Sequence, residues 1–333
     1  MFTITSRITF LRKEMNLSQE ELSNKIYLSR THIGNLETGR HSLTDSTIEK
    51  FCEVFNVPEI YFKSVERNDE FDLLLKKAFE DLLYNKTEKL YELFEKKIYH
   101  LEINQEVAFK LLQAVYYFKK NDFEKANKIS ENFISVFVKN VNLIKDEIVL
   151  LKYYYLFCYE INFIENRLKD CYHYCKMISE ITDDNYQKGR ILVIQSQILF
   201  RNDFLNEALK SINETIDFIE SFDKGFLLAS ANVALSSLLI SFKFYDEALV
   251  TLKKLENINK RIENEDISSA LLQHRGIIFE RRKEYLKAIE NYEKAYHIAK
   301  NHHNQIEFLI SLIICHLNTT TNTADVLKLK IKR

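Results

Sequence analysis

Apolar residues recur every three or four positions along most of this 333-residue chain, which is the spacing of helices that bury one face. Near the N-terminus the pattern predicts short helices that begin close to Ser6, Ser18, Ser29 and Thr44, and a fifth turn that begins at Pro58. Beyond about residue 70 the helices become longer, and the same spacing continues toward the C-terminus. The pattern therefore predicts an all-α protein with a small helical head and a long helical body.

The second and third helices of the head carry the clearest start and stop signals. Ser18 followed by Glu21 matches a capping box, and Ser29 is a suitable cap for the next helix. Gly39 permits the left-handed turn that would end that helix. Two short capped helices joined by a tight turn are typical of a helix-turn-helix, so this stretch predicts DNA binding.

In such a fold the third helix lies in the major groove, and its early residues meet base edges. Arginine suits guanine and asparagine suits adenine, so Arg30 and Asn35 are predicted to read bases. Gln19 is placed to hold a phosphate beside the free N–H groups of the second helix. The predicted DNA-binding residues are Gln19, Ser29, Arg30, Thr31, His32, Asn35, Arg40 and His41. The alternative is that they form only the solvated face of a small helical domain.

The head resembles the Xre/Cro-type helix-turn-helix family. The likeness is carried by residues 17–22, Ser29, Ile33, residues 36–40 and the apolar pattern of 48–57. The proline that this family usually carries shortly after the Gly-Arg pair is missing, and His41-Ser42-Leu43 stands in its place. The resemblance implies a five-helix DNA-binding domain.

Four segments of the body share one pattern, in which an aromatic residue precedes a helix-starting alanine by three or four positions. The small alanine lets the second helix of a hairpin approach the first, and the aromatic is predicted to plug the turn. A weaker copy has Cys171 in place of alanine. Because Phe204 lies four positions ahead rather than three, we expect a one-residue bulge there. The alanines are Ala126, Ala208, Ala248 and Ala288, and the last three are 40 residues apart.

This pattern resembles tetratricopeptide repeats, lengthened from the usual length of roughly 34 residues. The resemblance implies a right-handed solenoid of five to six helical hairpins between about Thr87 and Ile331, preceded by a linking helix over 69–84. The predicted domains are a helix-turn-helix domain (1–66), a linker helix (67–86) and a repeat domain (87–333).

Composition agrees with this fold and limits the function. The chain has only 5 glycines and 1 proline, the residues that interrupt helices. The first 64 residues carry 8 basic and 8 acidic side chains, so DNA binding requires basic residues gathered on one face. The five scattered cysteines suit reduced thiols in the cytoplasm. Residues 225–242 carry no charge, but their serines favour a buried helix over a membrane span.

The sequence offers little for catalysis or cofactors. It contains no glycine-rich phosphate loop, nucleophile elbow or run of metal ligands, so we expect neither an enzyme nor a cofactor. Cys171 and Cys175 would share a helix face while His173 points elsewhere, which favours buried repeat cysteines over a metal site. The basic ending, 328–333, could touch DNA or an acidic surface, although a solvated cap is favoured.

An Xre-type head followed by lengthened repeats resembles the peptide-sensing regulators of PlcR, NprR and Rgg type from low-GC Gram-positive bacteria, with the PlcR branch nearest. The resemblance implies a homodimer joined through the repeats, a palindromic operator in double-stranded DNA, and a short signalling peptide in the concave groove. Polar side chains counted onto or near the inner helix faces are the predicted peptide-binding residues: Arg190, Gln197, Arg201, Asn232, Gln273 and Glu280. The alternative is that these are ordinary solvated or hairpin-bridging residues.

Two functions are compatible with the sequence. The first is a cytoplasmic transcription factor whose promoter binding is controlled by a peptide. The second is an adaptor whose repeats bind a partner protein, such as a phosphatase or a kinase, with DNA binding secondary. Neighbouring reading frames that encode a secreted pro-peptide would favour the first.

Overall fold

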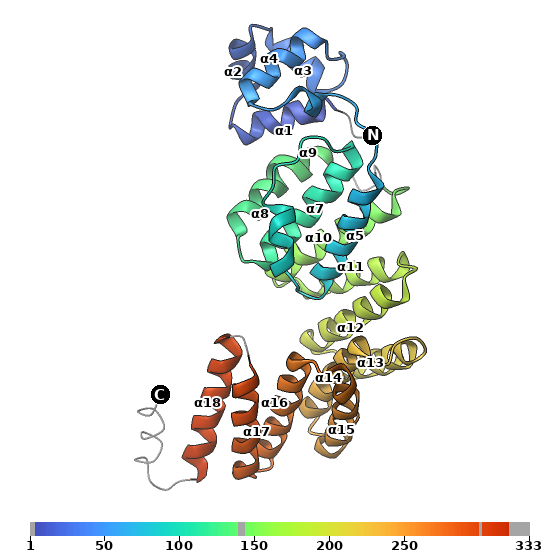
Figure 1. The fold of residues 1–333 in the computed structure, drawn as a ribbon, viewed down its shortest axis with the longest axis vertical. Coiled ribbons are helices and arrows are strands. Elements are labelled where there is room, and N and C mark those ends of the chain that lie inside the picture. Colours follow the sequence, from blue (N-terminus) through green and yellow to red (C-terminus); the bar gives the residue numbers. More distant parts are fainter. Residues whose placement is uncertain (1–3, 139–143, 300–301, 320–333) are drawn as a thin grey trace. The chain divides into compact units, whose positions relative to one another are not determined.

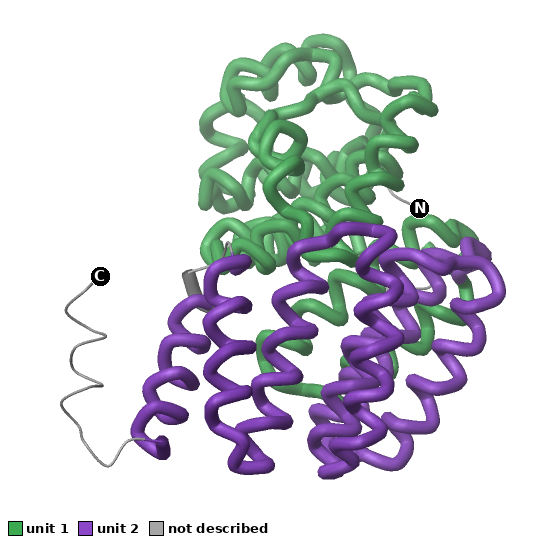
Figure 2. Tube along the Cα trace, turned by 60° about the horizontal axis from the view of Figure 1, so that its bottom comes forward, with its two compact units in different colours: residues 1–181 green, residues 182–333 purple. Residues whose placement is uncertain are grey.

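The computed structural model describes residues 4–138, 144–299 and 302–319, and every regular element in these ranges is helical. The chain forms two compact units, residues 1–181 and 182–333 (Figure 2). The head and the first helical hairpins belong to unit 1, and the later hairpins belong to unit 2 (Figure 1). The basic ending at 328–333 and the predicted boundary at Ile331 lie outside the described residues.

The head is built as the pattern predicts. Ser18 accepts a hydrogen bond from the Glu21 backbone and completes a capping box, Ser29 caps the next helix, and Gly39 adopts a φ of 72°. The fifth turn is a 3₁₀ helix. The elements are α1 (Ser6–Glu14), α2 (Gln19–Ile26), α3 (Arg30–Glu37), α4 (Asp45–Phe55) and η1 (Glu59–Phe62).

The rest of unit 1 begins with the predicted linking helix. The first hairpin starts at Ile103, later than expected, because two short elements occupy the stretch after Thr87. The elements are α5 (Asp69–Leu83), η2 (Glu88–Leu90), α6 (Tyr91–Phe94), α7 (Ile103–Lys119), α8 (Phe123–Ile129), the π-helical η3 (Ser130–Ile134), α9 (Ser135–Phe137), α10 (Ile148–Ile164) and α11 (Leu168–Glu180).

Unit 2 continues the hairpins. Residues 225–242 form the buried helix of one of them, and no helix among the described residues has the length and apolar character of a membrane span. The elements are α12 (Asn185–Arg201), α13 (Leu205–Glu220), α14 (Phe226–Ser241), α15 (Tyr245–Ile262), α16 (Glu265–Arg281), α17 (Tyr285–Ile298) and α18 (His302–Thr319).

The hairpins obey one local rule. In each of the five described pairs, a non-glycine residue with a φ between 56° and 62° ends the first helix, and a fully buried alanine or cysteine follows five positions later. The next N–H returns to the carbonyl five residues back, as when Phe204 donates to Leu199, which is a Schellman closure. The pairs are Asn121 with Ala126, Asn166 with Cys171, Asp203 with Ala208, Lys243 with Ala248, and Lys283 with Ala288.

This rule corrects two expectations. There is no bulge before Ala208, because Leu205 occupies the position that Tyr245 holds in the next hairpin and Phe204 lies one position earlier. The aromatic is also not a buried plug at two of the four turns, since Phe123 is 42% exposed and Phe204 is 44% exposed, whereas Tyr245 and Tyr285 are partly buried against the core. The buried small residue and the left-handed turn close each hairpin.

Candidate nucleic-acid interface

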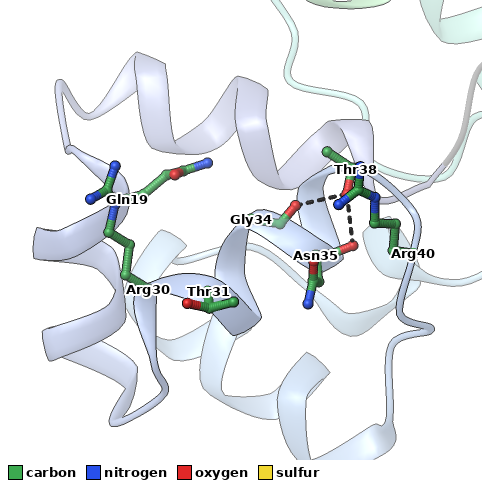
Figure 3. A pocket seen from close by; sticks show the side chains of 7 residues that line it. All are labelled: Gln19, Arg30, Thr31, Gly34, Asn35, Thr38 and Arg40. Carbon is green, nitrogen blue, oxygen red and sulfur yellow. Dashed lines mark hydrogen bonds between the residues drawn. The ribbon is translucent and has the colours of Figure 1, made fainter.

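A hollow on the head lies between the start of α2 and the outer face of α3 (Figure 3). Two of the residues that line it carry a guanidinium and none carries a carboxylate. The first 64 residues carry no net charge, yet this face is positive, which is the arrangement that a DNA-binding surface needs. The lining residues are Gln19, Arg30, Thr31, Gly34, Asn35, Thr38 and Arg40.

Glu37, at the end of α3, fixes one wall of the hollow. Its Oε1 and Oε2 accept hydrogen bonds from the Arg12 guanidinium at 2.6 and 3.2 Å. Its Oε2 also accepts a bond of 2.8 Å from the side-chain amide of Gln19. A third Arg12 nitrogen reaches the carbonyl of Leu17 at 2.8 Å. One carboxylate thus joins α1, α2 and α3 and orients the residue that we predicted to contact a phosphate.

The segment after α3 folds back onto the helix. The backbone carbonyl of Asn35 accepts hydrogen bonds from the N–H groups of Arg40 and His41, at 2.9 and 3.2 Å. The Thr38 hydroxyl donates to the carbonyls of Gly34 and Asn35 (Figure 3). Arg40 therefore lies beside the outer face of α3, on the same rim as Asn35 (Figure 3).

The hollow brings together five of the eight predicted DNA-binding residues, namely Gln19, Arg30, Thr31, Asn35 and Arg40. His32 and His41 lie next to each other, with ring centroids 5.2 Å apart. Ser29 is committed locally, because its hydroxyl accepts the N–H of His32 as the cap of α3. Glu37 was missed as the organising group because its partners lie 18 and 25 residues away in the sequence.

The residues predicted to bind a peptide do not share one face. Counted back from the left-handed residue that ends each helix, Arg190, Gln197 and Arg201 are 13, 6 and 2 positions before Asp203 and form one stripe on α12. Ser230 is 13 positions before Lys243, and its hydroxyl accepts a 3.2 Å bond from Arg190.

The other three candidates lie elsewhere. Asn232 is 1% exposed and donates to the Leu228 carbonyl within its own helix, so its predicted place on a ligand-binding surface is wrong. Glu280 accepts a 2.7 Å bond from the Tyr292 hydroxyl and thereby bridges its own hairpin. Gln273 is half-buried and lies 10 positions before the left-handed Lys283, so it matches none of the positions of the α12 stripe. The assumed bulge affects only the register of α12, so it does not account for these three residues, which lie on α14 and α16.

A buried histidine that has no distinctive sequence motif around it links two first helices of unit 2. His274 of α16 is hydrogen bonded through Nδ1 to Ser236 at 2.7 Å and through Nε2 to Ser237 at 3.2 Å, both on α14. Burial lowers the pKa of His274 to about 4. Its neutral ring therefore serves packing and hydrogen bonding between adjacent hairpins.

Fold and site together define the class: a helix-turn-helix DNA-binding protein with a helical-repeat body. Residues 8–62 match the family model for helix-turn-helix domains, in agreement with the Xre-type pattern of the head. The match covers the head alone, where it supports DNA binding.

Three solved structures resemble the chain. RapI in its apo form is 15% identical, with a TM-score of 0.57 over 77% of this chain and 73% of RapI. A Rap protein complexed with competence and sporulation factor is 13% identical, with a TM-score of 0.55 over 74% of this chain and 71% of that protein. PlcR from Bacillus thuringiensis, complexed with the peptide PapR7 and DNA, is 15% identical, with a TM-score of 0.43 over 90% of this chain and 94% of PlcR. No curated protein matches the chain.

Proposed function

We propose that the chain is a cytoplasmic transcription regulator that binds a palindromic operator as a homodimer and is controlled by a short peptide bound to its repeats. The observation that carries the DNA-binding part is the positive hollow of α2 and α3. There Arg30 and Asn35, the residue types suited to guanine and adenine, stand next to Gln19 and Arg40.

Substitution of the base-reading residues tests the interface. Arg30→Ala and Asn35→Ala should each remove about 1–3 kcal/mol of discrimination between operator sequences. Gln19→Ala should instead weaken binding to all DNA more evenly, because it removes a phosphate contact. Fluorescence titration against a randomised operator set measures both effects. Unchanged sequence preference in the two base-contact variants would exclude α3 as the recognition helix.

A single head makes few base contacts, so specific binding requires two heads on a two-fold-related site. We assign the dimer contact to α18, where four apolar residues spaced as one helical stripe are each at least 42% exposed: Ile306, Ile310, Ile314 and Leu317. The four positions carry no charge, so the stripe can pack against its own copy about a two-fold axis.

Sedimentation tests this assignment. Ile310→Lys together with Ile314→Lys should convert a dimer to a monomer at micromolar concentration. Val250→Lys is the matched control, because Val250 is an isolated apolar residue on α15 that is 71% exposed. A double variant that remains dimeric would remove α18 from the proposed interface.

For the peptide we assign the stripe of Arg190, Gln197 and Arg201 on α12, together with Ser230 on the adjacent α14. Guanidinium, amide and hydroxyl groups can bind the backbone and the terminal carboxylate of an extended peptide. The hydrogen bond from Arg190 to Ser230 supports this assignment, because it joins side chains of both helices.

The test uses synthetic peptides matching the C-terminal residues of short secreted reading frames near the gene. Calorimetry should show binding to wild type and at least about tenfold weaker binding to Gln197→Ala, whereas Asn232→Ala should not lose a direct contact. By linkage, operator DNA must change peptide affinity by the same factor that peptide changes DNA affinity. Peptide affinity that is equal with and without operator would contradict peptide control.

The second candidate is a protein-interaction adaptor. It is favoured by one observation, the large share of the chain that helical repeats occupy. If Arg30→Ala and Asn35→Ala leave regulation in the cell unchanged while Gln197→Ala abolishes it, the adaptor replaces the regulator.

A further inference from the structure

Arg7 of α1 is 1% exposed, and its side chain reaches from the head to the first repeat hairpin. Its Nε donates to Glu106 Oε2 of α7 at 2.7 Å, and its two terminal nitrogens donate to the carbonyls of Tyr61 and Leu101 at 2.6 and 2.9 Å. The guanidinium carbon also lies 4.6 Å from the centroid of the Tyr61 ring. Every guanidinium nitrogen of Arg7 therefore has an acceptor, either on η1 of the head or on the repeat side.

Residues of the head bind both oxygens of the Glu106 carboxylate. Its second oxygen, Oε1, accepts a hydrogen bond of 2.6 Å from the Tyr61 hydroxyl. Glu106 is 2% exposed, so this ion pair is well removed from water. The head makes a second contact with the repeats, where Phe10 of α1 packs edge-on against Phe133 of η3, with ring centroids 4.9 Å apart.

The neighbouring residue on α7 holds the chain segment that leaves the head. Gln105, also 2% exposed, accepts the N–H of Asn68 at 3.1 Å and donates to the carbonyl of Asn68 at 2.6 Å. It also donates to Asp72 of α5 at 2.9 Å. Two consecutive residues of α7 thus pin the head at Arg7 and Tyr61 and the connecting segment at Asn68.

We propose that Arg7, Tyr61, Gln105 and Glu106 form a head latch, which fixes the orientation of the DNA-binding head on the first repeat hairpin so that the two move as one body. The latch engages α1 and η1, whereas the predicted base-reading residues lie on α3, so DNA can bind while the latch is closed. A movement of the repeats then reorients the recognition helix directly instead of swinging a head on a loose linker.

The chemistry of the latch suits orientation better than stability. A buried ion pair contributes little net stability compared with apolar residues of the same size, but it accepts only one geometry. Replacement of both partners by methionine should therefore leave the unfolding midpoint nearly unchanged while the head gains freedom. A contact that only stabilised the fold would lower the unfolding midpoint when removed, without giving the head more freedom in the folded state.

Trypsin measures this freedom in the full chain. The segment between η1 and α5 contains Lys63 and Arg67, whose side chains are both 48% exposed. The latch pins the backbone at Tyr61 and Asn68, so the protease can bind this stretch in extended form only after the latch opens. The rate at which the head fragment is released, followed by mass spectrometry, reports the open population.

We expect Arg7→Met, Glu106→Gln and the double variant Arg7→Met/Glu106→Met to release the head about ten- to a hundredfold faster than wild type. Tyr61→Phe, which removes one hydroxyl, should give a smaller increase in the same direction. Arg275→Met is the matched control, since it removes an arginine–glutamate pair of unit 2 that lies outside the head. Its release rate should stay near that of wild type.

Two results would overturn the latch. One is a release rate unchanged in the double variant and in Tyr61→Phe, and the other is an equal acceleration in Arg275→Met. The measurement contains neither DNA nor peptide, so its outcome is independent of the proposed regulation.

Discussion

Glu37 holds Arg12 with both of its carboxylate oxygens, and the same carboxylate holds Gln19. The side chain of Glu37 is 6% exposed and that of Arg12 is 14% exposed. Each charged group has therefore lost most of its contact with water and is stabilised by the other. Glu37→Gln removes the charge while keeping the size of the side chain. We expect it to destabilise the head by about 2–3 kcal/mol, because the guanidinium stays partly buried without a counter-charge.

Hydrogen exchange of the α3 amides in the full chain measures this effect locally. Glu20→Gln, on the exposed face of the same helix-turn-helix, is the control and should leave exchange unchanged. Protection of α3 that stays at the wild-type level in Glu37→Gln would show that the ion pair does not hold the head together.

Gly276→Ala tests a close approach of two helices within a hairpin. A Cβ at position 276 would lie 2.5 Å from the Tyr292 ring, which is 1% exposed and tied by its hydroxyl to Glu280. The ring cannot shift without breaking that bond, so we expect a loss of about 1–3 kcal/mol by urea denaturation. Gly34→Ala is the matched substitution, because its Cβ would meet only the Gln19 amide, at 3.8 Å. It should stabilise α3 by about 1 kcal/mol, the helix propensity of alanine over glycine.

Lys243→Gly should stabilise the protein although it shortens a side chain. Lys243 has a φ of 62°, a conformation that glycine adopts without steric cost. Part of that gain is lost to the greater freedom of glycine in the unfolded chain, which leaves about 0.5–1 kcal/mol. Lys253→Gly, at an exposed position inside α15, should instead cost about 1 kcal/mol. Urea midpoints that move in the same direction for both variants would contradict the assigned turn.

His274 should make stability depend on pH. Burial lowers its pKa to about 4 from the ordinary value of 6.5, so the unfolded chain takes up a proton at a higher pH than the folded chain does. The neutral histidine's contribution is complete above pH 6.5 and is lost as the pH falls toward 4, by up to about 3 kcal/mol. The measurement is the unfolding free energy of wild type minus that of His274→Gln between pH 7 and pH 4. His173→Gln, at an exposed position, is the control and should show no such trend.

Much of this structure follows from short-range chemistry, and that part was predictable. Ser18 and Glu21 complete their capping box within three residues, and Gly39 takes its left-handed φ where the pattern places a stop. Local spacing likewise located the fully buried Ala248 and Ala288. The outer face of α3 follows from helical periodicity once the start of the helix is known.

The remainder depends on contacts between residues far apart in sequence. Arg7 and Glu106 are 99 residues apart, and a lone arginine in an N-terminal helix carries no local sign of its partner. The ligand stripe on α12 was blurred for a different reason, because Phe204 was aligned with Tyr245 when the left-handed residue was the true landmark. Aspartate and lysine at those turns give no sequence signal comparable to that of glycine.

Because these turns are equally spaced, the number of hairpins in the body can change without altering how each hairpin folds. Asp203, Lys243 and Lys283 are 40 residues apart, and each precedes its buried alanine by the same five positions. Excision of residues 204–243 would join Asp203 to Phe244 and leave Ala248 again five residues after a left-handed turn. Whole hairpins can therefore be lost or duplicated in evolution, or grafted by design, while the remaining helices keep the faces by which they pack.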